Sequence, residues 1–168
     1  MADNVRSPSS VADVLPTAVV QEYLDAVSGH RGAHPYATLL GLRTFDTAGL
    51  HRKVREGFSY AALERFRRTA DLSAAAVGEL LQIPERTFHR RKLEGRLRPD
   101  ESDRLLRFTR LFGKTLELFE GDLAAARSWL ERPLAALGGA RPIELAQSEP
   151  GTGAVEDLIG RLEHGVFT

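Results

Sequence analysis

A cluster of basic side chains lies between Pro84 and Arg98, where the chain has six lysines and arginines against two acidic residues. The planar guanidinium group of arginine can bridge the O6 and N7 acceptors of guanine, while lysine and threonine can hold phosphate oxygens. The candidates for such contacts are Arg86, Thr87, Arg90, Arg91 and Lys92. The cluster indicates DNA binding, and the alternative is a surface helix whose charges meet only water.

Residues 72–95 predict two short helices joined by a tight turn. Ser73 is a good N-cap for the first helix, and Gly78 would let the second helix cross closely over it. Pro84 is expected in the first turn of the second helix, where its missing N–H would have no partner. Phe88 would then face inward and the basic residues would occupy the outer surface. This arrangement is typical of a helix-turn-helix motif.

A long third helix is predicted from Pro99 to Phe119. Proline suits its first turn, and Asp100 and Glu101 lie near the positive end of the helix dipole. An apolar stripe follows at spacings of three or four residues, made of Leu105, Phe108, Phe112, Leu116 and Phe119. We expect this stripe to lie in the core, and part of it could instead form the seam of a dimer.

Two further helices are predicted in the last third of the chain. Asp122 should cap one whose inner face carries Trp129 and Leu130, and the final helix should begin near Thr152. The chain then ends on an apolar tail at 166–168. This tail is either a frayed terminus or a contact segment.

Composition and patterning restrict the class of protein. With 168 residues, of which 42% are hydrophobic, the chain can form one domain or two small helical domains that share a core. The absence of cysteine excludes disulfides and thiolate metal sites. The longest apolar runs are only a few residues, and no secretory signal is evident, so we expect a cytoplasmic protein with no membrane partner.

The net charge of zero conceals an uneven distribution. The middle of the chain, 57–114, has thirteen basic and eight acidic residues, whereas 115–168 has four basic and nine acidic residues. This asymmetry suggests two different partners. Together with the helical patterns, it predicts a disordered tail over 1–16, a helical region over 17–56, a helix-turn-helix domain over 57–114 and a C-terminal domain over 115–168.

The histidines do not form a catalytic or metal-binding arrangement. His30 and His34 are four residues apart, but Gly32 and Pro35 make a regular helix there unlikely, so the two rings would not converge on a metal. The other three are isolated in the sequence: His51, His89 and His164. We therefore expect a protein that is not an enzyme and that has no catalytic residue, metal or cofactor.

Three stretches resemble the Xre/MbcA/ParS antitoxins: IPERTFHRRKLEGRL with ESDRLLR, then ARSWLERPLAALGGARPIEL, then EPGTGAVEDLIGRLEHGVFT. The resemblance spans residues 46–168 and implies an all-α fold, with an Xre-like helix-turn-helix followed by a toxin-binding domain. Pro84 and Arg98 stand where such proteins often have a hydroxyl cap. Gln82 replaces the usual turn glycine, and a residue with a Cβ at positive φ costs on the order of 1 kcal/mol.

The resemblance also implies the partners. The toxin would be of the RES or ParT-like type, related to ADP-ribosyltransferases, and the C-terminal domain would cover its active-site cleft. The pair would repress its own operon by binding operator DNA. Independently of the resemblance, we expect a homodimer within the complex, because a monomer offers only one recognition helix. The toxin-facing residues would be Trp129, Leu130, Arg161, His164, Val166, Phe167 and Thr168. The alternative is a stand-alone transcription regulator with a C-terminal dimerisation or sensing domain.

Overall fold

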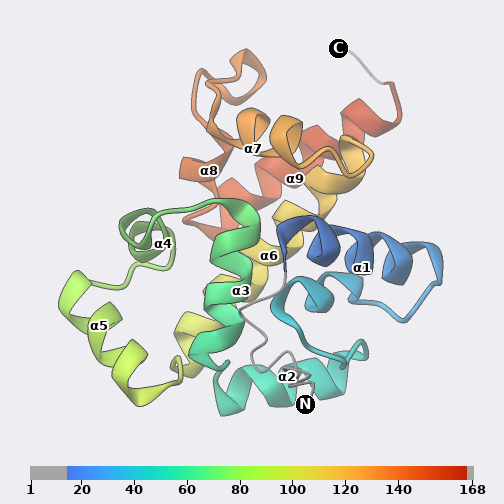
Figure 1. The fold of residues 1–168 in the computed structure, drawn as a ribbon. Helices are drawn as coiled ribbons and strands as arrows, with labels where there is room; N and C mark the ends of the chain where they lie inside the picture. Colours follow the sequence, from blue (N-terminus) through green and yellow to red (C-terminus); the bar gives the residue numbers. More distant parts are fainter. Residues whose placement is uncertain (1–14, 166–168) are drawn as a thin grey trace, which may run out of the picture.

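The computed structural model describes residues 15–165, which form nine α-helices and two 3₁₀ helices with no strand among them (Figure 1). This confirms the all-α fold predicted from the sequence. The predicted disordered tail lies outside the described residues up to residue 14, and Pro16 already belongs to the first helix. The helices are α1 (Pro16–Ser28), η2 (Pro35–Leu40), α2 (Thr47–Glu56), α3 (Tyr60–Ala70), α4 (Ala74–Leu80), α5 (Glu85–Glu94), α6 (Pro99–Leu118), α7 (Leu123–Glu131), η3 (Ala135–Leu137), α8 (Pro142–Leu145) and α9 (Glu149–Glu163).

Side-chain caps decide where several helices begin. The Ser73 hydroxyl accepts a hydrogen bond from the Ala76 N–H, and the Asp122 carboxylate accepts one from the Ala125 N–H, as the sequence predicted. The predicted start of the final helix near Thr152 is wrong, because α9 begins at Glu149. Its cap is Ser148, whose side chain accepts from the Gly151 N–H at 3.1 Å, and a proline fits the first turn.

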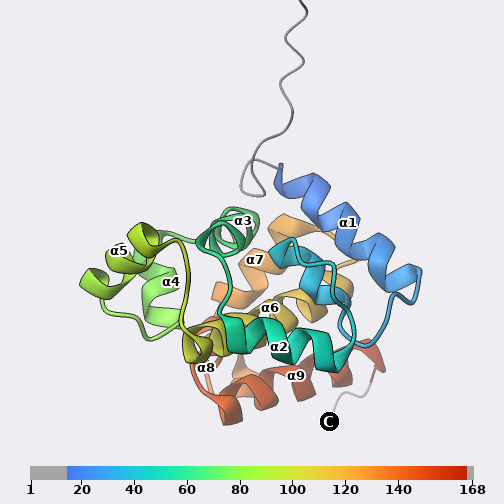
Figure 2. The ribbon, with the colours of Figure 1, turned by 90° about the horizontal axis from the view of Figure 1, so that it is seen from below.

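The long helix α6 runs through the centre of the molecule. The helices α1, α3 and η2 pack on one side of it and α9 packs on another (Figures 1 and 2). Phe66 of α3 meets Phe108 and Phe112 edge to face, with ring centroids 5.7 and 5.5 Å apart. Leu105 and Leu116 are fully buried, so the apolar stripe of α6 is core and is not available as a dimer seam.

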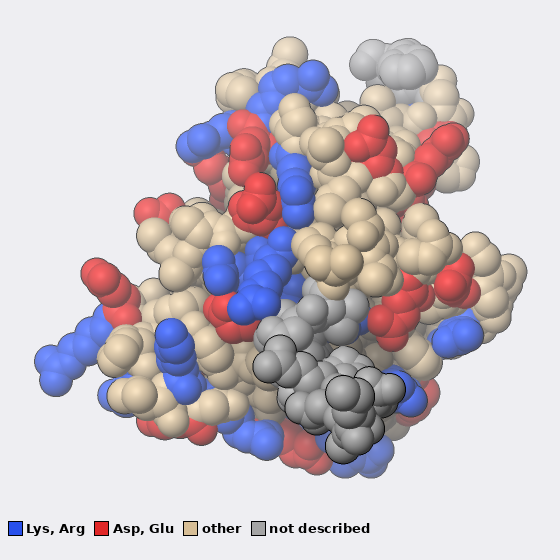
Figure 3. Space-filling view, in the orientation of Figure 1, with Lys and Arg blue, Asp and Glu red and all other residues tan. Residues whose placement is uncertain are grey.

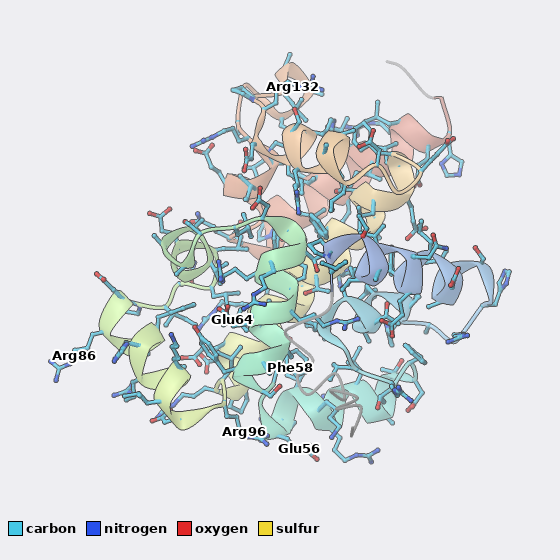
Figure 4. The ribbon with its side chains drawn as sticks, viewed as in Figure 1. Glu56, Phe58, Glu64, Arg86, Arg96 and Arg132 are labelled. Carbon is cyan, nitrogen blue, oxygen red and sulfur yellow. The ribbon has the colours of Figure 1, made fainter. Side chains whose placement is uncertain are left out.

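The α2–α3 turn is tied to the loop that follows α5. The Leu97 N–H donates to the Phe58 carbonyl at 2.8 Å, and the Tyr60 N–H donates to the Gly95 carbonyl at 2.9 Å. Arg96 donates to the carbonyls of Glu56 and Gly57, at 3.0 and 2.9 Å. Figure 4 shows Glu56, Phe58 and Arg96 near one another at this junction. These bonds fix the C-terminal end of α5 against the rest of the molecule.

Gly57 is the position in this junction that cannot accept a side chain. Its φ is 81°, and an added Cβ would lie 2.1 Å from the Leu97 carbonyl oxygen. We expect Gly57→Ala to lower the free energy of unfolding by at least about 2 kcal/mol, measured by urea denaturation followed by circular dichroism. Gly138→Ala is the matched control, because Gly138 has φ of 67° but faces open space. It should cost only about 1 kcal/mol, and equal losses would contradict the close approach.

Candidate functional site

The helix-turn-helix consists of α4, a tight turn and α5. Gln82 in the turn has φ of 54°, so a residue with a Cβ does occupy the left-handed position that the sequence predicted. The Ile83 N–H donates to the Gly78 carbonyl at 2.8 Å, and a Cβ on Gly78 would lie 3.2 Å from the Ile83 carbonyl oxygen. Gly78 therefore accommodates the backbone of the turn. Pro84 is the N-cap residue of α5, one position before the predicted first turn.

The outer surface of α5 carries most of the predicted basic residues. Arg86, Arg90 and Lys92 are exposed and Thr87 is half-buried. Arg86 extends away from the body of the molecule at the free side of α5 (Figure 4). The Arg90 side chain is 58% exposed, with a loose contact of 3.8 Å to Glu94. Phe88 is buried beneath them, as predicted. The guanidinium groups of α5 are thus presented to solvent from one helical face.

Arg91 does not belong to that face, and its predicted place on the outer surface is wrong. Its side chain is 4% exposed, and its Nε donates to both carboxylate oxygens of Glu101, at 3.0 and 2.8 Å. A terminal nitrogen donates to Glu94 at 2.8 Å. The hydrogen bonds with Glu101 raise the pKa of Arg91 above its usual range. Because Arg91 follows Phe88 by three residues, it shares the inner face of α5 and joins that helix to α6.

Tyr60 of α3 packs against the buried side of α5, and no pattern in the sequence singled it out. Its ring meets Phe88 edge to face, with centroids 5.9 Å apart. Burial, together with the negative Glu64, raises the pKa of Tyr60 to about 12. Burial would also raise the pKa of the Glu64 carboxyl, but two hydrogen bonds from Arg67, both 2.9 Å, outweigh it and leave this pKa below its usual value. The base of α5 therefore rests on a neutral phenol next to an ion pair.

Two of the predicted toxin-facing residues are core residues. Trp129 is 4% exposed and Leu130 is 3% exposed, and the indole packs on Phe119 with ring centroids 6.3 Å apart. They hold α7 against its neighbours and offer little surface to a toxin. The sequence pattern placed both on an apolar helical face, which was the signal for burial. Val166, Phe167 and Thr168 lie outside the described residues.

Two predicted toxin-facing residues remain among the described residues, and both lie at the end of the last helix, α9. Arg161 and His164 are exposed and border a shallow open surface together with Asp157 and Gly160. An added Cβ at Gly160 would meet nothing within 4 Å, so this stretch of backbone is open to close approach. One imidazole nitrogen of His164 lies 2.7 Å from the Gly160 carbonyl oxygen.

Ion pairs fix α9 on α6. Arg107 contacts Glu149 at 2.7 Å, and Glu156 accepts from Arg110 at 2.7 Å and lies 3.5 Å from the Lys114 ammonium group. The loop before α9 also contacts the turn of the helix-turn-helix. There the Gln82 side-chain amide donates to the Gln147 carbonyl oxygen at 3.3 Å. The two exposed surfaces therefore belong to one packed unit.

Within residues 15–165, no group of three or more side chains is placed to hold a metal ion. The same part of the chain contains no helix that is both long and apolar enough to cross a membrane.

A helix-turn-helix with an exposed basic helix, followed by a helical domain on the same long helix, defines a helix-turn-helix protein with an appended helical module. Residues 49–110 match the antitoxin Xre-like helix-turn-helix domain, and residues 115–165 match the antitoxin Xre/MbcA/ParS C-terminal toxin-binding domain. The boundary between the matches falls inside α6, as does the predicted boundary after residue 114.

Characterised relatives agree with these matches. The chain is 38% identical over 130 residues to antitoxin Xre of Yersinia enterocolitica, covering 77% of this chain and 88% of that protein. It is 28% identical over 137 residues to antitoxin Xre of Photorhabdus laumondii, covering 81% and 93%. A Prs ADP-ribosylating antitoxin of Sphingobium is 24% identical over 148 residues, covering 82% and 91%. The chain therefore belongs to the Xre/MbcA/ParS antitoxin family, as the sequence motifs indicated.

The two neighbouring arginines of α5 should behave oppositely when removed. Arg91→Ala leaves Glu101 buried without its partner and should lower the free energy of unfolding by about 3 to 5 kcal/mol. Arg90→Ala, on the exposed face, should change it by no more than about 0.5 kcal/mol. Urea denaturation of both variants measures the difference. A loss below about 1 kcal/mol for Arg91→Ala would contradict a structural role for the buried pair.

Proposed function

We propose that this chain is the antitoxin of a type II pair that neutralises a RES or ParT-like toxin and represses its own operon by binding operator DNA. The observation that carries the proposal is the separation of two exposed surfaces on one packed unit. The helices α5 and α9 lie on different sides of α6 in both views (Figures 1 and 2), and each carries exposed basic side chains. DNA and a toxin can therefore bind at the same time.

The DNA-binding surface consists of Arg86, Thr87, Arg90 and Lys92 on α5, without Arg91. An exposed guanidinium group on a recognition helix can bond to a guanine edge in the major groove, while lysine and threonine hold phosphates. One such helix is a weak binder, so the protein acts as a homodimer on a two-fold operator. The buried apolar stripe of α6 is not its seam, and exposed surfaces form the dimer contact.

Removal of the two exposed arginines tests the DNA-binding surface. Arg86→Ala combined with Arg90→Ala should weaken binding to the DNA upstream of the chain's own operon at least tenfold, because each bidentate guanine contact is worth about 1 to 3 kcal/mol. Gel-shift titration at fixed salt measures this. Arg43→Ala combined with Arg132→Ala is the control: it removes the same charge from exposed sites outside α4 and α5. Equal affinity for both double variants would contradict the assignment.

The toxin-binding surface is the exposed face of α9 with Arg161 and His164, continued by the tail at 166–168. The match of residues 115–165 to a toxin-binding domain supports this, and the relative named as a Prs ADP-ribosylating antitoxin supports a toxin of the ADP-ribosylating class. In the proposed complex, Phe167 enters the toxin's cleft, where its apolar ring is buried.

Toxin neutralisation should depend on the end of the chain. Deleting Gly165 to Thr168 should leave folding and operator binding intact but abolish rescue of cells that express the toxin encoded next to this gene. Arg161→Glu should reduce rescue through the same surface, whereas Arg43→Glu, with the same charge change at an exposed site away from α9, should rescue fully. Growth after toxin induction is the readout. Full rescue by the truncated chain would place inhibition elsewhere, and the lack of any toxin gene nearby would favour the stand-alone regulator.

A further inference from the structure

One acidic residue lies on the proposed DNA-binding helix without a partner. Glu85 is exposed in the first turn of α5, and among residues 15–165 no hydrogen bond or ion pair engages its carboxylate. The other acidic residue of α5, Glu94, bonds to Arg91, as does Glu101 of α6. In Figure 3, acidic as well as basic side chains stand out from the end of the molecule that α5 forms. A free carboxylate at this position opposes phosphate binding by Coulomb repulsion.

Glu85 also borders an open groove between α4 and α5. The groove encloses about 540 Å³, and small residues of α4, Ala74, Ala75 and Gly78, form its wall. Because these side chains are short, they leave the groove open beside Glu85. Glu79 is the other carboxylate that lines this groove, and it belongs to α4 rather than to the recognition helix.

The position of Glu85 and its chemistry give it a specific role. The N-terminal residues of a recognition helix are those that contact base edges in the major groove. A carboxylate only accepts hydrogen bonds, so it suits the N4 amino group of cytosine, whereas adenine presents the N7 acceptor beside its N6 amino group. We propose that Glu85 reads a cytosine in each operator half-site, next to the guanine read by Arg86 or Arg90. This inference rests on the proposed DNA binding and adds a base preference to it.

Selection of binding sites from random duplex DNA tests the proposal. The full-length protein should enrich a motif with a fixed cytosine in each half-site. Glu85→Gln should replace that cytosine with adenine, because an amide pairs with the N6 and N7 groups of adenine. Its affinity for the cytosine site should fall about tenfold, which corresponds to about 1.4 kcal/mol. Glu79→Gln makes the same charge change on the other side of the groove and should keep the wild-type motif.

A second variant separates base reading from the charge at the helix terminus. Glu85→Asp keeps a carboxylate in the first turn, where it stabilises the helix dipole, but shortens its reach. It should melt at the temperature of the wild-type protein and lose the cytosine preference. If Glu85→Gln and Glu85→Asp both keep the wild-type motif, Glu85 acts only on the helix dipole and the inference is wrong. If the wild-type protein enriches no motif at all, the proposed operator binding itself fails.

Discussion

The guanidinium group of Arg91 lies between two helices whose relative placement the rest of the structure depends on. Both carboxylate oxygens of Glu101 accept hydrogen bonds from its Nε, and the same carboxylate accepts one from the Arg98 backbone N–H at 2.7 Å. The Glu101 side chain therefore caps the beginning of α6 and also holds α5 against this helix. A buried pair of this kind adds little net stability, but an unpaired charge in its place costs several kcal/mol. Alternative orientations of α5 are therefore disfavoured. The exposed arginines on the other face of α5 gain a fixed geometry from this constraint.

Both surfaces are built on α6, which passes from the helix-turn-helix into the C-terminal domain without a break. Its buried stripe packs against α3 on one side, and its arginines at 107 and 110 pair with carboxylates of α9 on another. No flexible linker separates the two matched domains, since the boundary lies within the helix. The Gln82 to Gln147 hydrogen bond adds a second, smaller connection between the turn and the loop before α9.

The distribution of charge follows this division. Basic residues exceed acidic ones between 57 and 114, and acidic residues exceed basic ones after 115, yet several of these charges pair with one another across the boundary. Glu149 and Glu156 neutralise arginines of α6, so part of the apparent gradient is structural. Among the exposed charges, those on α5 and on the outer face of α9 are the ones proposed to meet partners.

Much of this protein was determined by short-range sequence. The caps at Ser73 and Asp122, the left-handed Gln82, the inward Phe88 and the long α6 all follow from interactions within a few residues, and the motifs were specific enough to give the family. Only the tertiary structure decided which polar and aromatic side chains are free. Arg90 and Arg91 are adjacent residues of the same type. Only Arg91 is buried, and there it is paired with Glu101, which lies ten residues further along the chain. For Trp129, the apolar face of its helix indicated burial, but only the tertiary structure shows that Phe119 is the ring packed against it.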